Sequence, residues 1–365
     1  MNCRRVGSMS SAALIIVGAL LTTAAPVVAK GHVDVLLSGL ASPKALFVGP
    51  PGDVFVGQGW FGPPGPVLDY SLTGPHRGQA LAITDPVPVA DITGTGDGAG
   101  WAIAYTGETD IALVRQASAG AAIEEILDID AYQAADPDPF DKDDPPNPTE
   151  TNPNGLAPLP NNDVLLADAA GNDLIRVSPN GDAHTVARWA VQQVGTDHLG
   201  NPNLPPTLPA EAVPTTVAMG RDGWAYVGQL TGFPAKPGSS YIWRVNPNAH
   251  DALCVVGSPN ADCAVWKGGF TSIFDIAFNP NNGTLYVYEV AKDSWLAFEE
   301  GFSNGGNFPP AVLLEVKGSR IRELVPGQLS EPGGVAVGHD GSIYVTDGAI
   351  GIFASHGRLL KIRGS

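Results

Sequence analysis

Short runs of apolar and β-branched residues, separated by Gly, Pro, Asn and Asp, fill the chain from residue 33 to its end. In most of these runs large apolar residues alternate with smaller or polar ones, which is typical of β-strands. Pairs of runs are joined by Asp-Gly or Asn-Gly, as at Asp222-Gly223 and Asp340-Gly341, and this is the strongest short-range signal for a hairpin. The hairpin unit recurs six times, at 43–58, 100–105 (a degenerate copy), 153–168, 214–229, 273–289 and 332–347.

Further apolar runs follow most copies of the hairpin. A third strand is predicted at 174–177, 241–245 and 313–316, and a fourth, outer strand at 321–325. Four antiparallel strands per unit, repeated around an axis, form a blade of a β-propeller. The sequence therefore predicts an all-β fold, with one six-bladed propeller domain over residues 30–365.

The two ends of the propeller region fit together in this scheme. The last copy ends with its third strand, at 358–362, and lacks a fourth. The run 33–40 stands before Pro43 as the outer strand 321–329 stands before Pro332. We therefore expect the N-terminal strand to complete the last blade and close the ring without a free edge.

Composition excludes several other classes of protein. The 365 residues include 45 Gly and 33 Pro, which a helical bundle does not tolerate, and 44% hydrophobic residues, which a disordered chain lacks. The net charge of −17 excludes nucleic acid as a partner, because a phosphate backbone needs a basic face. Part of this charge lies in an acidic, Pro-rich insert at 136–153, which we expect to be an extended, solvated loop. The stretch 123–135 before it is predicted to form one short helix.

The N-terminus has the pattern of a secretory signal peptide. Arg4 and Arg5 precede an apolar run at 12–21, and small residues lead to a cleavage site after Ala29. We therefore expect the mature protein to begin at residue 30 and to be secreted or to reside in the cell envelope. No later apolar run approaches the length of a membrane span, so no transmembrane segment is expected after cleavage.

Two cysteines remain once Cys3 leaves with the signal peptide. Cys254 and Cys263 flank a turn at 258–260, and in an oxidising compartment such a close pair predicts a disulfide that staples a surface loop. A metal site at this pair would need further soft ligands, which the neighbouring sequence lacks.

A polar residue ends the second strand of most copies. These residues are Gln58, Asp168, Gln229, Glu289 and Asp347, with Thr106 or Glu108 in the degenerate copy. Equivalent positions on six blades lie on one ring, and their oxygen atoms suit Ca²⁺ at the mouth of the channel. Such a ring is similar to that of the gluconolactonase-like and paraoxonase-like propellers, which hold a catalytic calcium. The alternative is that each side chain hydrogen-bonds the turn that follows its own strand.

Aromatic residues near strand ends offer a second candidate site. They are Trp60, Phe61, Trp101, Trp224, Phe233, Trp243, Trp295 and Phe298. Propellers commonly bind ligands on the loop face, where an aromatic lining suits a small molecule, a glycan or a protein. Most of these side chains are expected to pack between blades, with Trp224 and Trp243 in predicted strands.

Several segments resemble the ScyD/ScyE family of exported bacterial proteins. The resemblance is carried by 213–218, 226–234, 152–156, 167–174 and 269–275. It implies an exported, NHL-like six-bladed propeller and no particular chemistry. With no catalytic triad in the sequence, a binding or scaffold role in the envelope or outside the cell is the leading hypothesis. The alternative is a Ca²⁺-dependent lactonase or esterase-like hydrolase that uses Asp168, Glu289 and Asp347.

Overall fold

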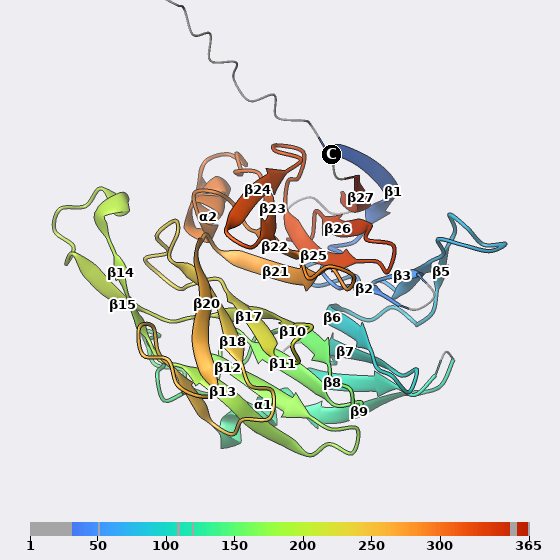
Figure 1. The fold of residues 1–365 in the computed structure, drawn as a ribbon, viewed down its shortest axis with the longest axis horizontal. Helices are drawn as coiled ribbons and strands as arrows, with labels where there is room; N and C mark the ends of the chain where they lie inside the picture. The colour runs from blue at the N-terminus through green and yellow to red at the C-terminus, as the bar shows by residue number, and fades with distance from the viewer. Residues whose placement is uncertain (1–30, 50–51, 108–109, 119, 351–355, 364–365) are drawn as a thin grey trace, which may run out of the picture.

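A computed structural model describes residues 31–49, 52–107, 110–118, 120–350 and 356–363. Six small antiparallel sheets stand around a central axis, as the predicted six-bladed β-propeller requires (Figure 1). The apolar core is divided among the interfaces between neighbouring blades.

Each blade contains four antiparallel strands, and the strands of each blade are given in order from the channel outward. Blade 1 holds β2 (Leu46–Val48), β3 (Val54–Val56), β4 (Leu68–Tyr70) and β5 (Ala80–Ala82); blade 2 holds β6 (Val89–Gly94), β7 (Gly100–Tyr105), β8 (Ile111–Gln116) and β9 (Ile123–Asp128); blade 3 holds β10 (Pro153–Pro158), β11 (Val164–Asp168), β12 (Asp173–Val177) and β13 (Ala183–Trp189). Blade 4 holds β16 (Pro214–Met219), β17 (Ala225–Gln229), β18 (Ser240–Val245) and β20 (Cys263–Phe270); blade 5 holds β21 (Ile273–Phe278), β22 (Leu285–Glu289), β23 (Val312–Lys317) and β24 (Arg320–Leu324); blade 6 holds β25 (Pro332–Val337), β26 (Ile343–Asp347), β27 (Gly357–Arg363) and β1 (His32–Leu40).

The predicted turn residues end the inner strands. Gly223 and Gly341 have φ values of 78° and 81°, a left-handed conformation that residues with a Cβ rarely adopt. The amide of Gly223 donates to the Gly220 carbonyl at 3.0 Å and closes the turn between β16 and β17. The repeated Asp-Gly therefore has a conformational cause at each of these hairpins.

The N-terminal strand closes the ring, as predicted. β1 pairs antiparallel with β27 along its whole length, from His32 opposite Arg363 to Leu40 opposite Gly357. Figure 1 shows β1 on the outer edge of the last blade, beside the C-terminal strand. This pairing covers the edge that β27 would otherwise expose.

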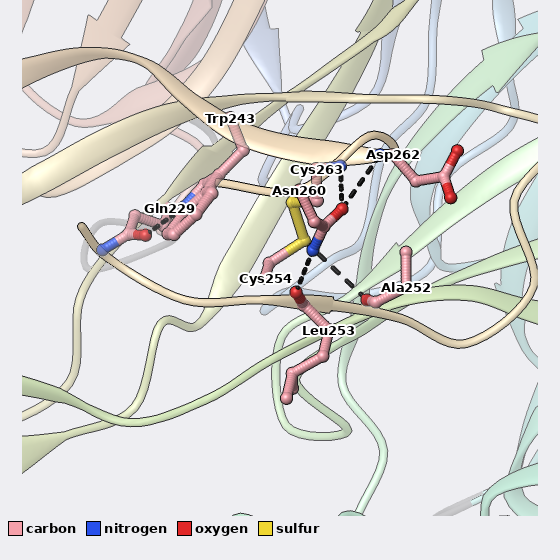
Figure 2. The surroundings of a disulfide bond; sticks show 8 residues. All are labelled: Gln229, Trp243, Ala252, Leu253, Cys254, Asn260, Asp262 and Cys263. Atoms are coloured by element: carbon pink, nitrogen blue, oxygen red, sulfur yellow. Dashed lines mark hydrogen bonds between the residues drawn. A yellow bond between two sulfur atoms is a disulfide. The ribbon is translucent and has the colours of Figure 1, made fainter. Parts of the chain in front are cut away.

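The predicted disulfide between Cys254 and Cys263 is present, with 5.4 Å between the Cα atoms. It does not lie in a surface loop, however, because the two residues are only 0% and 2% exposed. Cys254 ends β19 (Ala252–Cys254), a fifth, parallel strand on the outer edge of blade 3, whereas Cys263 begins the outer strand of blade 4. The disulfide therefore joins two blades, and it lies close to Trp243 in Figure 2.

The longest connections all leave the strands at one end of the ring, which we call the insertion face. They contain α1 (Ile129–Ala135), the hairpin of β14 (Gln192–Gly195) and β15 (Thr207–Ala210) with η1 (Asp197–Leu199), and α2 (Trp295–Ser303). This face lies at the start of each inner strand and at the end of each second strand, so the predicted polar ring lies there too.

The helix predicted over 123–135 is present only in the second half of that stretch. Residues 123–128 form β9 because they pair with β8, and the helix begins only after Asp128, whose carboxylate accepts the Ala131 amide at 2.9 Å. In the acidic insert that follows, most side chains are exposed, but Asp138 is buried and accepts a 3.0 Å hydrogen bond from Asn172.

The predicted signal peptide, with Arg4, Arg5 and the cleavage site after Ala29, lies outside the described residues. Among the residues that are described, no helix has the length and apolar character needed to cross a membrane.

Candidate functional site: the centre of the channel

A bulge near the start of the inner strand recurs around the ring. The strand register shifts there in β6, β10, β16, β21 and β25. A bulged residue is left out of the ladder, so its backbone groups must find other partners. At two of these bulges, the carbonyl oxygens of Ala90 and Asn154 accept a hydrogen bond from a side chain of another blade.

Lys44 lies just before β2 of blade 1, and its side chain contacts the bulged residues of two other blades. Its Nζ donates to the carbonyl of Ala90 in blade 2 at 3.0 Å and to that of Asn154 in blade 3. The rings of Trp60 and Phe274 lie 5.3 and 5.6 Å from the same atom. Lys44 is only 6% exposed, so the two carbonyls and two aromatic faces replace its hydration shell.

Two partly buried aspartates balance this charge from opposite parts of the ring. Asp91 of β6 accepts the Leu156 amide of blade 3 at 2.7 Å, and Asp275 of β21 accepts the Val335 amide of blade 6 at 2.6 Å. Each carboxylate thus ties its own inner strand to that of the next blade. Thr216 of blade 4 donates to Asp275 at 2.6 Å and extends this seam of polar contacts to the interface between blades 4 and 5.

Burial governs how these groups titrate. It raises the pKa of Asp91 to about 7, although the positive charge of Lys44 opposes the rise. Burial also raises the pKa of Asp275 and lowers the pKa of Lys44, while the two carboxylates act to keep Lys44 charged. The channel centre therefore holds one ammonium group against two carboxyl groups whose protons are held more tightly than usual.

An apolar cluster packs beside Lys44 at the mouth of the channel. It contains Phe274, Val290 and Phe298 with the partly buried Trp60, Leu230, Trp295, Phe308 and Ile350. Trp60 lies 5.5 Å from Phe274 in an edge-to-face arrangement, and the Trp295 indole donates to the Thr231 carbonyl at 2.7 Å. Side chains from blades 1, 4, 5 and 6 thus fill the mouth above the charged centre.

The five residues of the predicted ring are all buried, and each contacts its own blade or the loops next to it. Asp168 accepts the amides of Asn152 and Gly171 at 2.7 and 3.1 Å. Asp347 likewise accepts the Ser330 amide at 2.8 Å and forms an ion pair with Arg358. These contacts are those of the alternative interpretation, in which the side chains fix the neighbouring loops.

The other three members of the ring are engaged in the same way. Gln58 accepts the Ala41 amide at 2.9 Å, Gln229 accepts the Trp243 indole N–H, and Glu289 accepts the Thr271 amide at 2.8 Å. Among the described residues, no group of three or more His, Cys, Asp and Glu side chains has the arrangement of a metal site. The five side chains thus accept hydrogen bonds from the protein itself, and the calcium ring stays a prediction for metal-binding measurements. Of the two residues proposed for the degenerate copy, Thr106 is exposed and Glu108 lies outside the described residues.

The candidate aromatic residues divide into four groups. Trp101 and Trp243 are buried between blades, and Trp60, Trp295 and Phe298 belong to the cluster at the channel mouth. Trp224 precedes β17 and is only half-buried: it packs against the edge of the core cluster between blades 4 and 5, and the Arg244 guanidinium lies 3.7 Å from its ring. Phe61 and Phe233 are exposed on the insertion face.

Sequence reasoning missed Lys44, Asp91 and Asp275 because it examined the end of the second strand and not the start of the first. The signal was nevertheless present in the alignment of the repeats. The second position of the inner repeat reads Lys44, Ala90, Asn154, Thr215, Phe274 and Gly333, with one charged residue. The third position contains both aspartates, at 91 and 275.

Comparisons with known proteins place the chain by fold. No family model matches the sequence, and no curated protein matches it. The PQQ-bound aldose sugar dehydrogenase from Streptomyces coelicolor superposes with a TM-score of 0.50 at 15% identity, covering 92% of this chain and 98% of that one. A putative oxidoreductase (glucose dehydrogenase) from Thermus thermophilus gives 0.52 at 15% identity, with 91% and 99% covered. A putative gluconolactonase gives 0.51 at 12% identity, with 92% of each chain covered. At these identities the likeness is one of fold alone.

Proposed function

We propose that this chain is an exported, ScyD/ScyE-like propeller that binds a partner through its insertion face and acts as a binding or scaffold protein. The observation that carries the proposal is Lys44. Its ammonium group occupies the centre of the channel, where it is satisfied by the protein's own carbonyls and carboxylates. Because the protein's own groups already pair with this ammonium group and aromatic side chains cover it, a ligand has little access to the channel centre. This favours binding at the surface over chemistry in the channel.

The insertion face offers the surface for such binding. It contains the longest connections, and three phenylalanines there are largely exposed: Phe61 at 62%, Phe233 at 48% and Phe302 at 61%. They stand on connections of three different blades around the channel mouth. Exposed aromatic side chains on loops held by a rigid scaffold are typical of recognition surfaces. The partner that this surface suits is a glycan or a protein outside the cytoplasm, where the disulfide is stable.

Glu289 is the observation that favours the second candidate, a Ca²⁺-dependent hydrolase. It is 5% exposed, and burial raises its pKa to about 7, a value suited to proton transfer near neutral pH. One of the structures with a similar fold is that of a putative gluconolactonase. Under this hypothesis Glu289, Asp168 and Asp347 would act at the channel mouth.

Two measurements on the mature protein separate these functions. Calcium chloride is added during thermal unfolding and during an assay with a panel of aliphatic lactones, for the wild type and for Glu289→Ala. A binding protein shows no calcium-dependent rise in melting temperature and no turnover. Turnover that requires calcium and is lost in the variant would establish the hydrolase instead.

Binding itself is tested on arrays of glycans and of extracellular proteins. We expect saturable binding to at least one class of ligand, lost when Phe61, Phe233 and Phe302 are all replaced by Ser. The matched control is Trp266→Ser, because Trp266 is 40% exposed on the outer strand β20 and lies away from the insertion face. Binding that survives the triple substitution would place the recognition surface elsewhere.

A further inference from the structure

A cleft between blades 1 and 2 stands apart from the channel centre. Its volume is about 400 Å³. Blade 1 contributes Phe47, Phe55 and Ile83 to its walls, and blade 2 contributes Ile92, Ala102 and Val114. It extends from Thr106, at the insertion end, to Ser118, in the turn after β8 at the opposite end.

The cleft exists because blade 2 has small side chains on the face that it turns to blade 1. Along β7, small and large residues alternate through Gly100, Trp101, Ala102, Ile103 and Ala104. Successive residues of a strand point to opposite faces, and the large ones pack toward blade 3. The small ones face blade 1, where the apolar cluster is made mainly of Ala and Val.

No other blade has this arrangement at the equivalent positions. The two second-strand residues that face the preceding blade are Val54 and Val56, Ala102 and Ala104, Val164 and Leu166, Ala225 and Val227, Leu285 and Val287, and Ile343 and Val345 in blades 1 to 6. The third strand of blade 2 also has a small residue at this interface. Ala104 pairs with Ala112 of the third strand, whereas the equivalent pair in blade 4 is Val227 with Trp243. The missing volume is therefore specific to blade 2.

Among the described residues, none of the side chains that line the cleft is charged. Their polar groups are Thr84, Thr93, Thr95, Thr106, Gln116 and Ser118, and all other lining residues are apolar, aromatic or Gly. Burying a charge in such a site is costly because no opposite charge is present to pair with it. The net charge of −17 on the whole chain adds a long-range repulsion of anions.

We propose that this cleft binds a neutral, elongated, mainly apolar small molecule, such as a long-chain alcohol or an isoprenoid. The volume of 400 Å³ lies within the range of small-molecule sites. The apolar walls supply the affinity, and the hydroxyl groups at the rim suit a single hydroxyl or carbonyl group on the ligand. The absence of charge in the walls selects the neutral alcohol over the fatty acid of the same length. The lining of this site contains none of the three exposed phenylalanines of the proposed binding surface, so the inference goes beyond the proposed function and is tested independently of it.

The test uses Nile red, a neutral dye whose emission rises in apolar surroundings, and the folded mature protein. We expect saturable binding that cetyl alcohol displaces and that palmitate displaces much more weakly. Ala102→Leu, which fills the cleft, weakens dye binding by at least about tenfold because it takes the volume that the ligand needs, while the melting temperature stays the same or rises. Ala277→Leu, on the partly buried face of β21, is the control and leaves dye binding unchanged.

Several results would overturn the proposal. One is a wild type that does not bind Nile red saturably, and another is equal dye binding by Ala102→Leu. Ile83→Trp narrows the cleft from the partly exposed wall of blade 1, and it repeats the test if Ala102→Leu fails to fold. Equal displacement by palmitate would refute the choice of a neutral ligand. A wild type that sediments as a dimer, with a monomeric Ala102→Leu, would show that a second copy of the chain covers the cleft.

Discussion

The interface between blades 3 and 4 and that between blades 1 and 2 have the same strand topology and very different contents. Between blades 3 and 4, Trp189 and Trp243 meet edge to face at 6.4 Å, and the disulfide of Cys254 and Cys263 joins the same core cluster. Between blades 1 and 2, the position equivalent to Trp243 is Ala112, and a cleft remains open. Backbone pairing and turn residues thus fix the blade, while side-chain volume decides whether two blades form a closed core or leave room for a ligand.

The largest expected loss of stability is at the closed interface between blades 3 and 4. Trp243→Ala removes a side chain that is 2% exposed and leaves the Gln229 oxygen without its indole donor. We expect the free energy of unfolding to fall by about 3–5 kcal/mol, as measured by urea titration. Trp266→Ala, on the exposed side of the same blade, is the control and should cost much less. A loss for Trp243→Ala no larger than that of the control would mean that this interface is not the tighter one.

The disulfide provides the next test of the closed interface. Replacing Cys254 and Cys263 by Ala releases β19 from the outer strand of blade 4 and frees a short loop in the unfolded chain. We expect a loss of about 2–3 kcal/mol, seen as a lower melting temperature. Dithiothreitol should lower the melting temperature of the wild type toward that of the double variant and leave the variant itself unchanged. If the reductant has no effect on the wild type, the disulfide does not contribute to this interface.

The seam of polar contacts along the channel is common to several interfaces. Its contribution can be tested by measuring how stability depends on pH. The folded-state pKa of Asp91 is about 7, above its ordinary value of 3.8, so the folded protein holds this proton more tightly than the unfolded chain. Its contribution to stability is therefore complete below about pH 4 and is lost as the pH rises through about 7. Between pH 5 and pH 7 we expect the wild type to lose on the order of 1–2 kcal/mol through this group.

Asp91→Asn keeps an acceptor for the Leu156 amide and removes the titration. Melting temperatures of the variant should therefore change less with pH than those of the wild type over this window. Asp97→Asn is a control, because the pKa of that surface carboxyl lies below its ordinary value and it does not titrate in this range. Parallel pH profiles for the wild type and Asp91→Asn would show that Asp91 is not the group responsible.

The smallest expected effect is at the open interface between blades 1 and 2, where we expect a substitution to raise the free energy of unfolding. Ala102→Val gives blade 2 a branched side chain like those at equivalent positions of blades 1 and 3. Filling part of the cleft should raise the free energy of unfolding by about 0.5–1 kcal/mol, measured by urea titration without ligand. Ala225→Val, at the equivalent position of the closed interface, should instead destabilise the protein because that site is fully buried. If both substitutions destabilise equally, the two interfaces are packed alike.

Much of the fold was predictable from local pattern. Asp222-Gly223 and Asp340-Gly341 require left-handed turn residues, and the alternating runs on either side of them admit only strands. The ring closure by 33–40 was predictable because one outer strand was missing from the last repeat. The cysteine pair was predictable as a disulfide, but its buried position between two blades was not, because the parallel strand β19 has no signal of its own.

The candidate site was less predictable. The polar residue that ends the second strand is visible in the repeats, yet the structure engages Asp168 and Asp347 in bonds to their own loops. The role of Lys44 was not predictable, because a single lysine next to Pro43 has no local signal that marks it as buried. Its importance comes from the carbonyls of two other blades, at sequence separations of 46 and 110 residues.

The sequence by itself determined the number of blades, the hairpin turns, the closure of the ring and the pairing of the cysteines. All of these follow from backbone conformation and from a period that repeats along the chain. Only the tertiary structure decided where a lysine finds its partners, which polar side chains hold loops, and which interface stays open. Those outcomes depend on volumes and charges that different blades bring to one place, and no local pattern records their sum.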